Sequence, residues 1–191
     1  MVKEIITIHV GSFGAGVGKS FWEQQCIENG IGLDGKFNKK NLVNDGKETG
    51  TYFIETKKGK FTPRAIFLDN DNTSIEELKS LEFKDLFDAE NLFYGNFDVN
   101  HYGYACDDEV NGYITNSSEK LRKEVEKCNS LEGIVVMNSV SSGFGSLIGG
   151  GIMNNCATNY SNAVTYGVNL YLDNNFKTSI QIYDTVLGFQ K

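Results

Sequence analysis

Apolar residues gather in short runs that are separated by longer polar or amphipathic stretches. The runs are rich in Ile, Val and Phe, as is typical of strands that are buried on both faces. Residues 107–128, by contrast, place Leu121, Val125 and Cys128 on one helical stripe. Strands that alternate with helices indicate an α/β domain with a mostly parallel sheet flanked by helices in three layers, of Rossmann-like type. We expect its strands at residues 4–10, 64–68, 133–137 and 164–172.

The stretches between these strands predict smaller elements. Residues 35–50 are polar and rich in Gly, Asn and Lys, and we expect a mobile loop there. Residues 51–56, TYFIET, alternate like an edge strand, and Pro63 opens the second buried strand. Ser74 with Glu77 three positions later reads as a capping box that begins a short helix reaching about Leu81. A glycine-rich helix start is expected at 143–151 and a final helix at 183–189.

Four glycines follow the first strand, namely Gly11, Gly14, Gly16 and Gly18. We predict a glycine-rich turn over this segment and a helix from about Lys19 to Asn29. A turn of this kind directs backbone N–H groups and a helix N-terminus at the end of the strand, which is how chains hold phosphate groups. Within it, GAGVGKS at residues 14–20 is close to a Walker A sequence, but the strict spacing requires glycine where Phe13 stands. A P-loop ATPase is therefore a minor alternative.

Composition restricts the class of protein further. With 191 residues and 40% hydrophobic content, the chain is long enough to bury a core, and we expect a single domain over residues 1–191. The net charge of −7 leaves no basic stripe for phosphates, which argues against nucleic acid and membrane surfaces as partners. No leader or membrane span is recognised, and the four cysteines have no metal-ligand spacing, so we expect buried, reduced thiols and a cytoplasmic location.

Several motifs resemble the tubulin superfamily, and they occur in the family's order. The opening EIITIHVG, the segments FWE, ENGI and DG at residues 21–35, and FTPRAIFLDND at 61–71 are similar to the first two strands and first helix of a tubulin. NLFYGN at 91–96, Asn100 to Tyr102, and SLEGIVVMNSVSSGFGS at 130–146 resemble the third strand, its loop and the strand before the tubulin glycine signature. The segments EIIT and SLEG are most similar to gamma-type tubulins. The resemblance spans nearly the whole chain but only the nucleotide-binding half of a tubulin.

The resemblance implies a site for GTP or GDP, with magnesium, across the carboxyl ends of the strands. Asp69 and Asp71 match the acidic loop on the magnesium side, although turn and capping roles explain the same two residues equally well. His101 lies beside the expected phosphates, whereas His9 is expected to be a buried structural histidine. Residues carried over as nucleotide-binding are Gly11, Ser12, Asp69, Asp71, Asn100, Ser139, Gly143, Phe144, Gly145 and Ser146.

This chain departs from the family pattern where phosphates would bind. A tubulin reads G-G-G-T-G-S-G in its signature, and this chain reads SSGFGSL over residues 141–147. Phe144 therefore replaces a threonine hydroxyl, and losing one charge-assisted hydrogen bond to phosphate costs about 1.5–3 kcal/mol. In the last loop, Lys177 and Gln181 stand where the family has acids, and Ile182 stands where it has proline.

The chain also ends before the central helix, the water-activating loop and the C-terminal domains of a tubulin. Without that helix we expect several hundred Å² of apolar surface to need a partner. These departures predict a structural, non-catalytic tubulin-like protein of a microtubule or axonemal assembly, bound to tubulin or other cytoskeletal proteins. A module that retains GTP or GDP as a structural ligand is the alternative.

Overall fold

A five-stranded parallel sheet forms the centre of the computed structural model, which describes residues 2–38, 49–79, 83, 85–95, 97, 99–171 and 178–189. The strands β1 (Glu4–Val10), β4 (Ala65–Asp69), β5 (Leu92–Tyr94), β6 (Leu131–Ser139) and β7 (Val164–Leu170) lie in the order β5-β4-β1-β6-β7. Every neighbouring pair is parallel. The predicted α/β fold with a mostly parallel sheet flanked by helices is confirmed.

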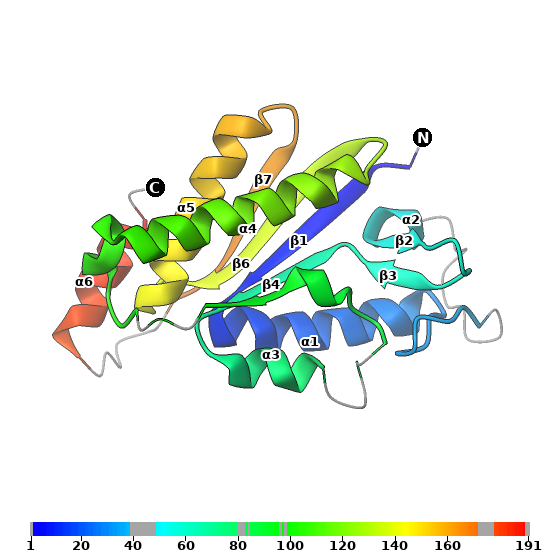
Figure 1. Cartoon of the computed structure of the whole chain (residues 1–191), viewed down its shortest axis with the longest axis horizontal. Helices are drawn as coiled ribbons and strands as arrows, with labels where there is room; N and C mark the ends of the chain where they lie inside the picture. The colour runs from blue at the N-terminus through cyan, green and yellow to red at the C-terminus, as the bar shows by residue number, and fades with distance from the viewer. Residues whose placement is uncertain are drawn as a thin grey trace.

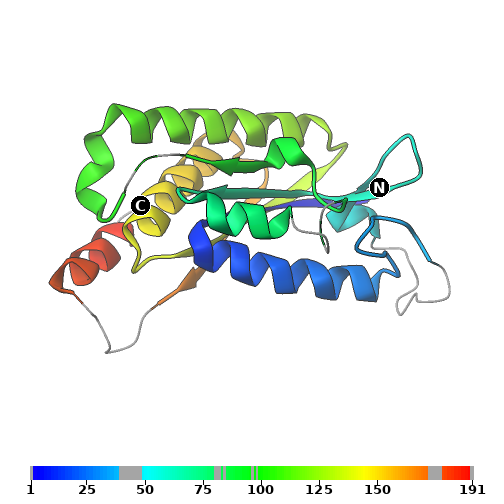
Figure 2. The same ribbon diagram turned by 60° about the horizontal axis from the view of Figure 1, so that its bottom comes forward.

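Helices cover both faces of the sheet (Figure 1, Figure 2). On one face, α1 (Gly11–Glu28) lies across β1, β4 and β6, with α3 (Asn72–Leu78) beside it. On the other, α4 (Asp108–Glu126) and α5 (Gly143–Asn159) pack against each other and the sheet. The last helix, α6 (Ser179–Gly188), packs on α5, and two short 3-10 turns, η2 (Ala89–Asn91) and η3 (Tyr102–Cys106), complete the connections.

The sheet separates two hydrophobic clusters. The cluster under α4 and α5 contains Ile6, Ile8, Val136 and Phe144, and the cluster under α1 contains Trp22 and Phe67. The four cysteines are free thiols, of which Cys26 and Cys156 are buried as expected, whereas Cys106 is exposed. None of the described helices is long and apolar enough to cross a membrane.

The glycine-rich turn predicted between the first strand and Lys19 is wrong, because α1 begins at Gly11 itself. Glycine is a poor helix former, but here its missing side chain is required by packing. A Cβ at Gly14 would lie 2.7 Å from the backbone oxygen of Met137, and one at Gly18 would lie 2.6 Å from Nδ1 of His9. The glycines therefore let α1 lie close against the sheet instead of forming a loop.

Other predicted boundaries also moved. Asp71, not Ser74, caps α3, since its carboxylate accepts the N–H of Thr73 at 3.2 Å. Within residues 51–56, only Phe53–Glu55 is a strand, β2, and it pairs with β3 (Phe61–Pro63) in a separate antiparallel sheet, after the short helix α2 (Thr49–Tyr52). The final helix begins at Ser179, four residues before the predicted start. Most of the predicted mobile loop, residues 39–48, and Leu81, Leu172 and Lys177 lie outside the described residues.

His9 is buried in the centre of this packing, as expected for a structural histidine. The indole Nε1 of Trp22 donates to its Nε2 at 3.2 Å, and the ring stacks on Phe67 with centroids 4.5 Å apart. Burial lowers the pKa of His9 to about 3, and a backbone interaction with Gly14 opposes this only in part. The imidazole is therefore neutral in the folded protein.

Packing of α1 gives the first prediction. Gly14→Ala is expected to destabilise the protein by about 1–3 kcal/mol, because the added methyl group would contact the backbone of β6. Gly16→Ala is the matched control, since no atom lies within 4 Å of the added Cβ, and it should stabilise by up to about 1 kcal/mol. Urea unfolding of both variants measures the difference, and equal effects would contradict this account of the glycines.

Neutral, buried His9 gives a prediction on pH. The unfolded chain protonates His9 below about pH 6.5 and the folded chain only near pH 3. The unfolded state therefore binds more protons in this window, and stability is lost as the pH falls, by up to about 1.4 kcal/mol per pH unit. A His9→Gln variant should lose less stability between pH 6.5 and 4 than the original chain in urea titrations. Parallel pH profiles for the two proteins would show that His9 is not the responsible group.

Candidate functional site

The strand order reverses at β1, which lies between β4 and β6. In open α/β sheets, ligands bind beyond the carboxyl ends of the strands at such a reversal. Both α1 and α5 begin at this edge, directly after β1 and shortly after β6, so their N-terminal amides lie there together. The topology therefore places a candidate site at the start of these two helices.

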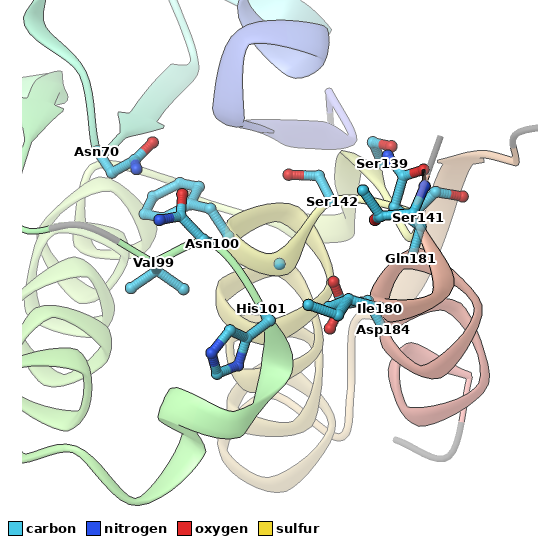
Figure 3. A pocket seen from close by; sticks show the side chains of 13 residues that line it. Asn70, Val99, Asn100, His101, Ser139, Ser141, Ser142, Ile180, Gln181 and Asp184 are labelled. Carbon is cyan, nitrogen blue, oxygen red and sulfur yellow. Dashed lines mark hydrogen bonds between the residues drawn. The ribbon is translucent and has the colours of Figure 1, made fainter. Parts of the chain in front are cut away.

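A cavity of about 510 Å³ opens at this edge (Figure 3). Its volume lies within the range of about 300–1,000 Å³ that is common for ligand pockets. Side chains from the ends of β4 and β6, from the segment before η3, and from α6 converge on it. The lining consists of Asn70, Val99, Asn100, His101, Ser139, Ser141, Ser142, Gly143, Phe144, Thr178, Ile180, Gln181 and Asp184.

The start of α5 is held tightly against its surroundings. A Cβ at Gly143 would lie 2.4 Å from the backbone nitrogen of His101, and one at Gly145 would lie 2.3 Å from the backbone oxygen of Ser139. These two glycines are thus required by contacts within the protein, whether or not a ligand is bound. Ser142 is the N-cap of the helix, and its Oγ accepts the N–H of Gly145 at 3.4 Å.

Phe144 belongs to the core as well as to the pocket wall. Its side chain is buried, with ring centroids 5.8 Å from Tyr113 and 6.2 Å from Phe97. A Cβ at Gly11 would meet the Phe144 ring at 3.6 Å, so the ring also lies next to the start of α1. The aromatic ring therefore fills the space beneath the two helix starts and forms part of the floor of the cavity.

Asp69 and Asp71 both act in local structure. Oδ1 of Asp69 accepts the N–H of Asn70 at 2.8 Å, while its Oδ2 is buried without a hydrogen bond to the described residues. Burial raises the pKa of Asp69, against the lowering effects of the Ser74 hydroxyl and the neighbouring amides. Asp71 caps α3, and the Thr73 amide lowers its pKa. Turn and capping roles are thus present, and the magnesium role stays a prediction.

The helix α6 closes one side of the pocket. Asp184 is buried, and its carboxylate accepts the backbone N–H of Tyr102 at 2.6 Å. Thr185 reaches Ser141 with a hydroxyl-to-hydroxyl distance of 3.2 Å. The backbone N–H of Thr178 donates to Oε1 of Gln181 at 3.4 Å at the helix start. These contacts fix α6 against both η3 and the segment that precedes α5.

The electrostatic character of the pocket is neutral to acidic. Asp184 is the only charged residue among the described residues that line it, since no Lys or Arg contributes to the wall. Among the described residues, no group of three His, Cys, Asp or Glu side chains is placed to hold a metal ion. The described part of the wall therefore presents hydroxyl and amide groups, which suit a polar ligand, but no Lys or Arg that would neutralise a polyphosphate.

The structure brings together only part of the set named from the sequence. Asn100, Ser139, Gly143 and Phe144 line the cavity. Ser12 lies instead in a small hollow between α1 and α3, and Lys19, the lysine of the Walker-like sequence, lines that same hollow with its Nζ 5.3 Å from the centre of the Phe83 ring. The remaining candidates do not line the cavity, and they are Gly11, Asp69, Asp71, Gly145 and Ser146.

Sequence reasoning missed three residues of α6 and its start, namely Thr178, Ile180 and Asp184. One signal was available, because Thr178 and Gln181 have the spacing of a capping box. That spacing marks the helix start at Ser179 and turns Asp184 to the same side as Gln181. The contact of Asp184 with Tyr102 joins residues 82 positions apart, and no local pattern predicts it.

Comparison with known proteins identifies relatives of this arrangement. The family model described as "Tubulin/FtsZ family, GTPase domain" matches residues 4–191 of this chain. The tubulin alpha chain of the Guillardia theta nucleomorph is 35% identical over 196 residues, and the tubulin alpha-1B and alpha-2B chains of Physarum polycephalum are 33% and 32% identical. Each alignment covers 98% of this chain but 42% of the relative. These relatives are alpha chains, and the likeness of EIIT and SLEG to gamma-type tubulins stays a prediction.

The packing of Phe144 gives a prediction on stability. Phe144→Ala should cost about 3–5 kcal/mol, because it leaves a cavity beside Tyr113 and Phe97. Ser12→Ala, at an exposed position of α1, should change stability by no more than about 0.5 kcal/mol. Thermal or urea unfolding measures both. A small effect at Phe144 would mean that the ring serves the pocket and not the core.

Proposed function

The chain belongs to the Tubulin/FtsZ family, and from this membership we propose that it is a structural, non-catalytic component of a cytoskeletal assembly in the cytoplasm, either microtubular or axonemal. Its partners would be tubulin or other cytoskeletal proteins. The chain spans less than half the length of the tubulin chains that it matches. The proposal therefore depends on the surface and the pocket of this chain and not on the activity of those relatives.

One observation carries the proposal, namely the apolar surface formed by β7 and α6. Along β7, alternate side chains face outward together, and Tyr166 is 60% exposed. On α6, Tyr183 is 68% exposed. The rings of Tyr171, directly after β7, and Phe189, directly after α6, have centroids 6.1 Å apart, so the ends of the two elements are in contact. The apolar residues of this surface are Val164, Tyr166, Val168, Leu170, Tyr171, Ile180, Ile182, Tyr183, Val186 and Phe189. An apolar surface of this kind is typical of a protein–protein interface.

The pocket supports a non-catalytic role. Phe144 stands at a position where the family has a threonine hydroxyl, and the helix start beside it is already capped by Ser142. Among the described residues, the wall supplies no cation for phosphate charge, and the carboxylate of Asp184 would repel that charge. We therefore expect no GTP hydrolysis by the chain alone.

A second function, retention of GTP or GDP as a structural ligand, is favoured by the size and polarity of the cavity. Asn100, Ser139 and Gln181 supply amide and hydroxyl groups for a sugar or base. The first-turn amides of α1 have no side-chain cap at Val10, and they would face a phosphate. Nucleotide bound with magnesium would stabilise the folded state, because the ligand would bind the folded chain and not the unfolded one.

Nucleotide content separates the two functions. The protein is purified from its native assembly and denatured, and the released nucleotides are separated by chromatography. The proposed function predicts substoichiometric nucleotide and no phosphate release from added GTP. Stoichiometric GTP or GDP without hydrolysis would establish the structural-ligand function instead. Turnover of GTP by the isolated protein would overturn both.

A charge placed on the apolar surface tests the partner. Tyr166→Lys should weaken cosedimentation with microtubules at least tenfold, because burying an unpaired ammonium group at an interface costs about 1.4 kcal/mol or more. Thr115→Lys, at an exposed position of α4, introduces the same charge away from this surface and should leave cosedimentation unchanged. Equal binding by both variants, or none by the original chain, would contradict microtubules as the partner of this surface.

A further inference from the structure

Two serines, Ser141 and Ser142, precede α5 at the pocket, and each has a partner within the protein. Ser142 has an extended backbone, with φ −109° and ψ 134°, as an N-cap residue requires. Its Oγ accepts the N–H of Gly145. An acceptor oxygen therefore already occupies one of the amide positions to which a ligand at the start of this helix would bind.

Ser141 is used in a different way. Thr185 donates its hydroxyl proton to the backbone oxygen of Gln181 at 2.6 Å. The contact of 3.2 Å between the Thr185 and Ser141 hydroxyls is then best formed with Ser141 as the donor, since a hydroxyl has one proton. Ser141 thus ties α6 to the segment before α5, while Ser142 alone acts on the helix amides.

The start of α1 differs from that of α5 in this respect. Its N-cap is Val10, which has no side-chain oxygen and makes no capping hydrogen bond. The two helix starts at this edge of the sheet therefore differ, since α5 is capped by its own serine and α1 has no side-chain cap. Figure 3 shows the Ser142 side chain directed toward the side of the pocket where Asn70 and Asn100 lie.

We propose that Ser142, which lines the pocket, determines whether it accepts a phosphate group, because its hydroxyl accepts the Gly145 N–H, a helix-start amide that would otherwise be open to a phosphate oxygen. This inference rests on the proposed non-catalytic function and assigns the expected weak phosphate binding to one residue. The serine oxygen is attached to the chain and is present at every ligand concentration. A phosphate must displace it and also enter a pocket whose described lining contains Asp184 and no Lys or Arg.

Three residues that all cap helices well allow a graded test at this position. Ser142→Gly removes the competing oxygen at little cost in stability, and Ser142→Asp keeps the cap and adds a negative charge. The probes are GDP with Mg²⁺ and inorganic phosphate, with binding measured by calorimetry. The dissociation constant for GDP should fall about tenfold or more from Ser to Gly, the factor expected for one regained hydrogen bond to phosphate. It should rise from Ser to Asp.

A second readout distinguishes local competition from a general change in stability. In nitrogen-15 amide spectra, the Gly145 resonance should shift on titration with GDP in the Ser142→Gly variant and stay unchanged in the original chain. Ser118→Gly, a matched substitution on α4 outside the pocket, should bind GDP as the original chain does. Melting curves establish that each variant is folded.

Two outcomes would overturn the inference. Weaker GDP binding by Ser142→Gly than by the original chain would mean that the serine hydroxyl donates to the ligand instead of competing with it. Equal binding or no binding by all three proteins would mean that Ser142 does not control the pocket. In the last case the proposed structural function would stand, because that function fails only on the nucleotide and hydrolysis measurements or on the partner measurement.

Discussion

The close approach of two helices to the sheet is the constraint on which the rest of the structure depends. Gly14 brings α1 against the backbone of Met137, and Gly145 brings α5 against the backbone of Ser139. Both contacts are with β6, from opposite faces of the sheet. Because the strand order reverses beside β6, the two helices begin at one edge with their amides in the same crevice. The location of the pocket thus follows from two glycines, Gly14 and Gly145, where any larger side chain would collide with the backbone of β6.

The sequence predicted the central architecture well, because buried parallel strands are continuous apolar runs. The strand at residues 4–10 has the predicted bounds, and the other strands shift only at their ends. The glycine-rich segment failed because helix propensity is a weak local preference that packing against the sheet overrides. The Ser74 capping box failed because Asp71, three residues earlier, provides a better-placed carboxylate.

The candidate site was predictable only where the chain forms it locally. Asn100, Ser139, Gly143 and Phe144 follow strands whose ends converge, so resemblance and topology together find them. The side of the pocket built by α6 was not found, since it depends on the contact of Asp184 with Tyr102 far along the chain. The role of Phe144 was only half visible, because a sequence shows a lost hydroxyl but not the aromatic neighbours that a ring gains.

Pocket and surface meet in α6, which has a role in each. Gln181 and Asp184 line the cavity, while Tyr183 and Val186 on the same helix are exposed to solvent. The inner side of the helix is held by the Thr185–Ser141 contact and by the Tyr102 amide, which together are a small number of hydrogen bonds. A protein that covers the outer side would therefore order α6 and with it one wall of the cavity. Under the proposed role in assembly, partner binding would be coupled to the shape of the pocket through this helix, so that role and a residual nucleotide site do not exclude each other.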